Sequence, residues 1–412
     1  MNSNALLQTD ADLGRTNNRF TARLRRGVTR AGAGIVFLWK YFLGVLLCQS
    51  LIGSVMIVGW TYRLMQRCAL KYWWKRSRLP GEGGRFEEFV ARSHLTSPHA
   101  GWPNWVVAAG AWGQIRVRAP EGPAAQLRAA LRVAANSLGK NLKLGLQGIF
   151  NTWVLTMPGC VLWLFAWYDG WNNSFNKGYE QAAVGPLTGV LGVLCFITAM
   201  LYVPMAQARQ AATGHWRSFY QFRLVWSLVR RRWLACLGLA TLYSLLSLPV
   251  MLLKTLPEFF PQMNRSLVGI EGVRAMEILK SYFFWCGLLV FPAYVFSKIA
   301  AARIYASAVL AGTRRGSVPE ELLGDIEWQA LHQLDLFELK TQPARHVLIR
   351  LMTWTGSRVG KITVGALLGL VWFTFVAQIF ISEFLNYHPG IGWLNQPLVQ
   401  LPWFHYLPPH LK

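Results

Sequence analysis

The side chains best suited to metal chemistry form one small cluster in this chain. His332, Asp335 and Glu338 follow one another at intervals of three, so they share part of one face of a predicted helix. Imidazole and carboxylate groups are common metal ligands, but no second group completes a site here, so we expect no metal and no cofactor. We interpret Glu327, Asp335 and Glu338 as a solvated face, or as an acidic strip that contacts basic helices or a protein partner.

A second group of reactive side chains lies between residues 85 and 100. It contains Glu88, His94 and His99, which an enzyme acting on lipids could use. However, the sequence contains no GxSxG elbow, no HExxH motif and no Walker lysine loop. The six cysteines include no CxxC pair, so neither a zinc site nor a disulfide framework is predicted. These observations favour a protein that is not an enzyme.

Basic side chains are the remaining candidates for a binding site. The chain has 42 Lys and Arg against 18 Asp and Glu, a formal charge of +24. Such a charge fits nucleic acid or anionic lipid headgroups, and the apolar segments between the basic runs favour lipid and exclude nucleic acid. Lys40, Lys254, Lys298 and Arg303 lie within or beside apolar segments, and we interpret each as a side chain that snorkels to the headgroups; a lipid-phosphate site near Lys298 and Arg303 is the alternative. The predicted lipid-binding residues are Arg63, Arg67, Lys71, Lys75, Arg230, Arg231, Arg232, Lys298 and Arg303.

Apolar segments of membrane length must position these basic side chains. The chain is 53% hydrophobic and only 15% charged, and its mean hydropathy is positive. We predict an all-α fold: a polytopic transmembrane helical bundle of five or six spans, with basic amphipathic interfacial helices. The interfacial helices are predicted at 62–78, 120–144 and 207–232, and the spans at about 36–60, 146–168, 182–206, 233–253, 281–303 and 362–383.

These segments divide the chain into seven predicted regions. They are a basic N-terminal amphipathic segment (1–35), a first membrane segment (36–60), cytoplasmic or interfacial basic helices (61–145), a transmembrane core (146–312), a cytoplasmic helical insertion (313–361), a last transmembrane helix (362–385) and an extracytoplasmic aromatic tail (386–412). Within the insertion, Ser317 and Glu320 have the spacing of a capping box, which predicts that a helix starts there.

The distribution of Lys and Arg orients the predicted spans. Residues 62–145, 207–232 and 313–361 contain 14, six and seven basic residues, whereas the alternate loops are nearly neutral. Positive loops stay in the cytoplasm, so we expect these three regions inside and the C-terminus outside. The segment 36–60 leaves two alternatives: a full crossing, with the Arg-rich N-terminus outside, or a re-entrant element that keeps the N-terminus inside.

Part of the chain resembles a known family. The stretches FNTWVLTMPGCVLWLFAWYDGWNNSFNKGYEQ and LYVPMAQARQAATGHWRSFYQFRLVWSLVRRRW, within about 146–253, are similar to an uncharacterised family of bacterial multi-pass membrane proteins. The resemblance implies a bacterial inner-membrane location and carries over no activity and no catalytic residue. We therefore expect a non-enzymatic membrane-organising or interaction protein that acts through anionic lipids and a protein partner or a second copy. The alternative is a transporter, facilitator or lipid-handling protein, which the lack of acids within the spans disfavours.

Overall fold

The computed structural model describes residues 34–93, 95, 122–166, 184–270, 272–337 and 357–370. Within these ranges the chain is helical and contains no strand, so the all-α prediction is confirmed for them. A helix spans Gly34–Leu47 and another covers 357–370. The others are α2 (Leu51–Trp74), α3 (Phe86–Arg92), α5 (Pro123–Phe165), α7 (Val184–Thr213), α8 (Phe222–Arg231), α9 (Trp233–Thr255), α10 (Phe260–Met263), α11 (Gly272–Thr313) and α12 (Asp325–Gln333), with short 3-10 turns η4 (Trp216–Tyr220), η5 (Leu256–Phe259), η6 (Arg265–Leu267) and η7 (Glu320–Leu322).

One of the described helices is long and apolar enough to cross a membrane. This helix is α11, and two shorter apolar helical stretches are Gly34–Leu47 and Trp233–Tyr243. The criterion is length and composition alone, so a bundle of five or six spans stays a prediction. Most of the N-terminal segment 1–35, the greater part of the last predicted span and the tail 386–412 lie outside the described residues.

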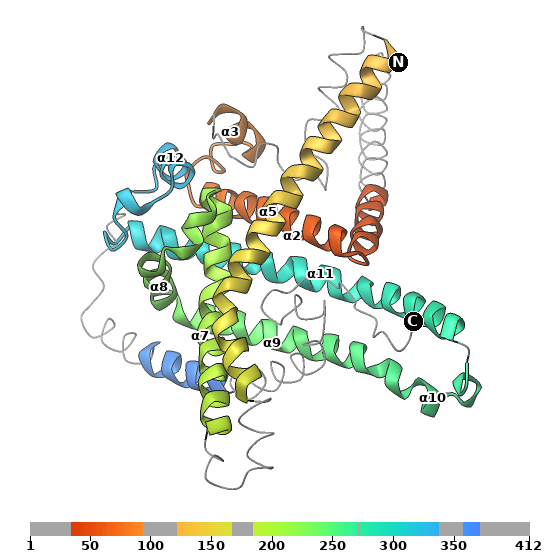
Figure 1. Ribbon diagram of the computed structural model, residues 1–412. Helices are drawn as coiled ribbons and strands as arrows, with labels where there is room; N and C mark the ends of the chain where they lie inside the picture. The colour runs from red at the N-terminus through yellow and green to blue at the C-terminus, as the bar shows by residue number, and fades with distance from the viewer. Residues whose placement is uncertain are drawn as a thin grey trace, which may run out of the picture.

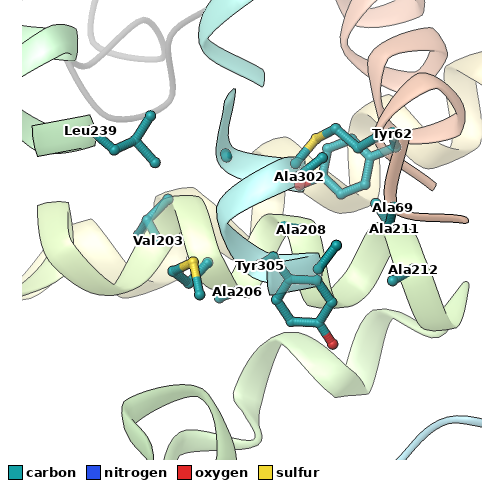
Figure 2. Close-up of a cluster of buried hydrophobic side chains, with 14 of the residues drawn as sticks. Tyr62, Ala69, Val203, Ala206, Ala208, Ala211, Ala212, Leu239, Ala302 and Tyr305 are labelled. Carbon is teal, nitrogen blue, oxygen red and sulfur yellow. The ribbon is translucent and has the colours of Figure 1, made fainter. Parts of the chain in front are cut away.

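The long helices pack as two pairs around α2. In Figure 1, α5 and α7 run side by side in opposite directions, and so do α9 and α11. Helix α2 contacts α5, α7 and α11, and so it lies where the two pairs meet. Figure 2 shows the core at this meeting point, where small side chains gather: Ala206, Ala208, Ala211 and Ala212 from α7, Ala302 from α11 and Ala69 from α2. Small side chains allow helix backbones to approach closely, which suits a bundle held by packing.

Helices α2 and α5 approach each other closely at two glycines. A Cβ atom on Gly59 would lie 1.8 Å from the carbonyl oxygen of Asn141, and one on Gly145 would lie 1.9 Å from the carbonyl oxygen of Val55. A real Cβ cannot occupy either position, so this crossing requires glycine on both helices. The predicted interfacial helix 120–144 and the span that follows it are one continuous helix, α5.

The first predicted span is divided in the structure. A helix covers Gly34–Leu47, and α2 begins at Leu51 and continues to Trp74 without a break at residue 60. Ser50 causes the new start: its hydroxyl accepts a hydrogen bond from the Gly53 amide at 3.1 Å, which satisfies a donor that the first helical turn leaves free. The predicted interfacial helix 62–78 is therefore the second half of α2.

The capping box predicted at Ser317 and Glu320 is wrong. The Ser317 hydroxyl instead donates to the Gly312 carbonyl at the end of α11 and accepts a hydrogen bond from Arg231. A single 3-10 turn, η7, follows, and α12 begins only at Asp325. The capping carboxylate is that of Glu327, which accepts a hydrogen bond from the Gly324 amide at 3.0 Å. The predicted box fails because the Ser317 hydroxyl has another partner.

Candidate functional site

Three regions that the sequence assigns to the cytoplasmic side lie together in the structure. Figure 1 shows α3, α8 and α12 at the same end of the helices, where α2, α7 and α11 terminate. Side chains from these regions bond to one another's backbone: Gln333 Nε2 donates to the Ser93 carbonyl at 3.0 Å, and Gln66 Nε2 donates to the Ala212 carbonyl at 3.3 Å. Helix α10 and η6 lie at the other end of α9 and α11.

Helix α8 and its flanking turns present a basic and aromatic surface at this end. The apolar side of α8 is buried through Leu224, Val225, Leu228 and Val229, which contribute to the core. The opposite side is solvent-accessible, and between residues 207 and 232 the sequence contains six arginines and no acid. We call this the α8 surface; its exposed members are Trp216, Arg217, Phe222, Arg223, Arg230, Arg232 and Trp233.

The three consecutive arginines predicted to bind lipid divide into two kinds. Arg230 and Arg232 are exposed on the α8 surface. Arg231 is partly buried, donates from Nη1 to the Ala311 carbonyl at 2.8 Å and also bonds to the Ser317 hydroxyl. Burial, and then the like charges of Arg315 and Arg232, lower the pKa of Arg231. Arg231 therefore holds the end of α11 against α8, and the two exposed arginines are free to face a ligand.

The predicted basic face of α2 is only partly a surface. Arg63 is 1% exposed and donates from Nη1 to Asn141 Oδ1 at 2.8 Å and to Ser137 Oγ at 3.3 Å, because α5 covers this turn. Arg67 forms an ion pair with Glu87 of α3. The other predicted members, Lys71 and Lys75 on α2 and Arg303 on α11, are exposed. Lipid binding by these exposed residues stays a prediction.

Glu327 is fully buried, so it does not belong to a solvated face; it contacts the predicted basic helix 207–232, as the other interpretation of the acidic strip expects. Its carboxylate forms an ion pair with Arg209, whose side chain is 1% exposed. Tyr305 of α11 donates its hydroxyl to Glu327 Oε1 at 2.5 Å and accepts from Arg209 Nη1 at 3.0 Å. Burial lowers the pKa of Arg209, but Glu327 and Tyr305 raise it by more, so the net pKa lies above its ordinary value.

This ion pair fastens the insertion to the long helices. Arg209 also donates from Nε to Gln221 Oε1 at 3.0 Å and from Nη2 to the Leu322 carbonyl, so it joins α7, α8, η7 and α12. Of the remaining predicted face, Asp335 is exposed, with a left-handed φ of 52°, and Glu338 lies outside the described residues. His332 is exposed and stacks on Trp328, with ring centroids 5.0 Å apart.

Lys298 occupies a very different place from a snorkelling lysine. Its side chain is only 3% exposed, and Nζ donates to Gln207 Oε1 at 2.8 Å. The snorkelling interpretation of Lys298 is therefore wrong. Gln207 in turn donates from Nε2 to Thr152 Oγ1 at 2.9 Å, and the Thr152 hydroxyl donates to the Gly148 carbonyl at 2.8 Å. A chain of hydrogen bonds thus runs from α11 through α7 to α5.

Two tyrosines face this ammonium group. Lys298 Nζ lies 5.2 Å from the ring centroid of Tyr294 and 5.5 Å from that of Tyr243, distances at which a cation is attracted to an aromatic face. We call this cluster the lysine site; it consists of Thr152, Gln207, Tyr243, Tyr294 and Lys298, from α5, α7, α9 and α11.

The other side chains that the sequence offers for metal binding or catalysis are not brought together in the described part of the chain. No group of three or more His, Cys, Asp and Glu side chains there is close enough to hold a metal ion. His94 and His99 lie outside the described residues, and Glu88 pairs with Arg92 at 3.1 Å on an exposed face of α3. Comparisons with family models, curated proteins and solved structures find no match to this chain.

Proposed function

We propose that this chain is a multi-pass protein of a bacterial inner membrane with its C-terminus outside. Apolar side chains run in exposed stripes along the long helices; on α11 the stripe includes Trp285, Leu289 and Phe296. On α5 the spacing of the stripe is three or four residues: Leu146, Phe150, Val154, Met157, Val161 and Phe165. Polar groups such as Gln207 and Lys298 are buried instead. Apolar side chains outside and polar side chains inside suit a protein surrounded by lipid. A protein in water usually has the opposite distribution.

Within that membrane, the proposed function is organisation of anionic lipids and of a protein partner, without catalysis. The observation that carries this proposal is the α8 surface. Trp favours the headgroup zone, and each Arg near an anionic surface contributes about 1 kcal/mol of attraction. Arg217 lies over the Trp216 ring at 5.5 Å, so one arginine of this surface already pairs with an aromatic residue. A protein partner would bind the exposed acids of η7 and α12, because Glu327 is buried. These acids are Glu320, Glu321 and Asp325.

Charge reversal on the α8 surface tests this function. In the Arg230→Glu, Arg232→Glu variant we expect the purified full-length protein to retain less phosphatidylglycerol, because two attractive charges become repulsive. The protein is extracted from membranes containing phosphatidylethanolamine and phosphatidylglycerol, and native mass spectrometry counts the lipids of each kind. Retained phosphatidylethanolamine should not change, and the difference from wild type should shrink at high salt.

A matched control has the same charge change at the other end of the molecule. Arg274 and Lys280 are both exposed on the first turns of α11, far from α8. The Arg274→Glu, Lys280→Glu variant should retain as much phosphatidylglycerol as the wild type. If both variants lose this lipid equally, the attraction reflects net charge and the α8 surface has no special role. Selective solute uptake by liposomes containing the wild type would instead favour a transporter.

The proposed orientation makes a separate prediction. A reporter that is active only in the cytoplasm should be active when fused after Leu322 in η7 and inactive when fused after Leu267 in η6, because one predicted span separates these positions. The measurement is reporter activity in intact cells, normalised to the amount of fusion protein. Equal activity at both positions would contradict a crossing by α11. Fusions at residues 1 and 412 further decide whether the number of spans is odd or even.

A further inference from the structure

A cavity lies between the end of α2, the turn that follows it, α3 and α12, which meet at one end of the molecule (Figure 1). Its volume is about 350 Å³, and pockets that bind small ligands measure about 300–1,000 Å³. Apolar side chains form part of the lining: Trp74, Leu79 and Phe89. None of the lining residues belongs to the α8 surface or to the lysine site, so this cavity is a separate candidate site.

Specific contacts hold the walls of this cavity in place. The Trp74 ring at the end of α2 packs edge-on against Phe86 of α3, with ring centroids 5.8 Å apart. The turn between these helices contains Gly83 with a φ of 77°, a left-handed conformation that favours glycine. On the other side, Gln333 Nε2 of α12 donates to the Ser93 carbonyl at the end of α3. The cavity is therefore formed without a ligand.

Charged groups of both signs line this cavity. Arg85 and Arg92 of α3 are the cations, and the one acid in the lining is Glu82 of the turn. Glu88, outside the lining, bonds to Arg92 at 3.1 Å but lies 4.0 Å from Arg85, so it compensates one arginine rather than two. The ion pairs found between described residues do not include Glu82. One guanidinium and one carboxylate of the lining therefore have no close counter-charge.

We propose that this cavity binds a zwitterion, with a primary ammonium group and an anionic group next to apolar carbon. The Arg85 guanidinium binds the carboxylate or phosphate, the Glu82 carboxylate accepts from the ammonium, and the apolar lining covers the carbon skeleton. A ligand that is only an anion is disfavoured by Glu82, and one that is only a cation by the arginines. A free apolar amino acid and the headgroup of an ethanolamine phospholipid share this chemistry. The inference goes beyond the proposed function and does not rest on it.

The test is calorimetric titration of the full-length protein in detergent, after lipid has been removed by extensive washing. L-leucine and a short-chain phosphatidylethanolamine are the two probes, titrated separately. Arg85→Gln and Glu82→Gln should each weaken binding of the zwitterion by about tenfold, because each removes a charged hydrogen-bonding partner at an exposed position. Both variants should unfold at the same temperature as the wild type when no ligand is present, because neither side chain is buried.

Analogues that lack one group show whether both charges are recognised. Isocaproate keeps the carboxylate and the carbon skeleton of leucine but has no ammonium group, and short-chain phosphatidylglycerol differs from the lipid probe in the same way. Both should bind the wild type about tenfold more weakly than the zwitterions. Glu82→Gln should bind these anions more tightly than the wild type does, because it removes a repulsion, so its effect changes sign between the two kinds of probe. Glycine, which lacks the apolar portion, should bind about tenfold more weakly than leucine.

Matched controls make the same charge changes outside the cavity. Arg78→Gln and Glu87→Gln alter exposed residues that do not line it, and both variants should bind as the wild type does. The Arg230→Glu, Arg232→Glu variant should also bind normally, so failure of the α8 proposal and failure of this one give different results. Binding of leucine identifies a free amino acid as the ligand, and binding of the short-chain lipid alone identifies a headgroup. The proposal is wrong if neither probe binds the wild type, if Glu82→Gln binds the zwitterion undiminished, or if the control variants lose as much affinity.

Discussion

Replacing Glu327 with glutamine should lower the free energy of unfolding by about 3–5 kcal/mol, because it leaves the buried guanidinium of Arg209 without a counter-charge. The side chains of Arg209 and Glu327 are 1% and 0% exposed, so water cannot replace the lost carboxylate. The carboxylate also accepts hydrogen bonds from Tyr305 and from the Gly324 amide, which begins α12. The measurement is denaturant-induced unfolding of the purified protein in detergent, followed by circular dichroism.

Two further variants show whether the loss comes from the unpaired charge. Arg209→Met combined with Glu327→Leu should recover part of the stability, since it removes the unpaired charge but leaves the buried Tyr305 hydroxyl without its partners. Glu87→Gln breaks the exposed pair with Arg67, where the glutamate side chain is 65% accessible, and should cost less than about 1 kcal/mol. Equal losses in Glu327→Gln and Glu87→Gln would show that the buried pair contributes no more than a surface pair.

The buried pair illustrates what the sequence cannot predict. Arg209 and Glu327 are 118 residues apart, and no periodic pattern links them. Glu327 lies on a short helix with the composition of a solvated segment, so its neighbours predict exposure. Its burial follows from the way α12 packs against α7, and that contact depends on the whole arrangement of the long helices. The same reasoning applies to Lys298, whose apolar neighbours along α11 predict a membrane helix but do not show which face is buried.

Helical periodicity predicts a shared face but not what covers it. Arg63, Arg67, Lys71 and Lys75 do repeat every four residues, and the last two are exposed as a surface helix requires. Arg63 is buried because α5 crosses α2 at that turn, which the spacing of basic residues cannot reveal. The signal for the crossing was present in other residues: Gly59 on α2 and Gly145 on α5 are small enough for close contact. However, a glycine in a helix does not by itself show which other helix packs against it.

The features that the sequence does predict depend only on local composition. The absence of strands among the described residues follows from long apolar and amphipathic helical patterns. The amphipathic character of α8 is also predicted by its residues, since Leu224, Val225 and Leu228 form the buried side and Arg223 and Arg230 the exposed one. What sequence does not specify is the surface against which the apolar side packs: we expected lipid, and the structure places it on the protein core.

Replacing Gly59 with alanine should destabilise the protein by about 3 kcal/mol or more, although alanine is the better helix former. In an isolated helix the change would stabilise by about 1 kcal/mol. Here the added Cβ would lie 1.8 Å from the carbonyl oxygen of Asn141, and backbone cannot move aside as a flexible side chain can. The two helices must separate, which lengthens the hydrogen bonds from Arg63 to Asn141 and Ser137. Insertion of atoms into a packed contact costs about 1–3 kcal/mol even where side chains can adjust.

The matched control is Gly139→Ala, where the same atom is added to α5. A Cβ at Gly139 meets no other atom within 4 Å, so only the intrinsic helix preference acts and stability should rise by about 0.5–1 kcal/mol. The two substitutions are therefore expected to have opposite signs in the same unfolding measurement. A stabilising effect of Gly59→Ala would mean that α2 and α5 do not cross at this glycine.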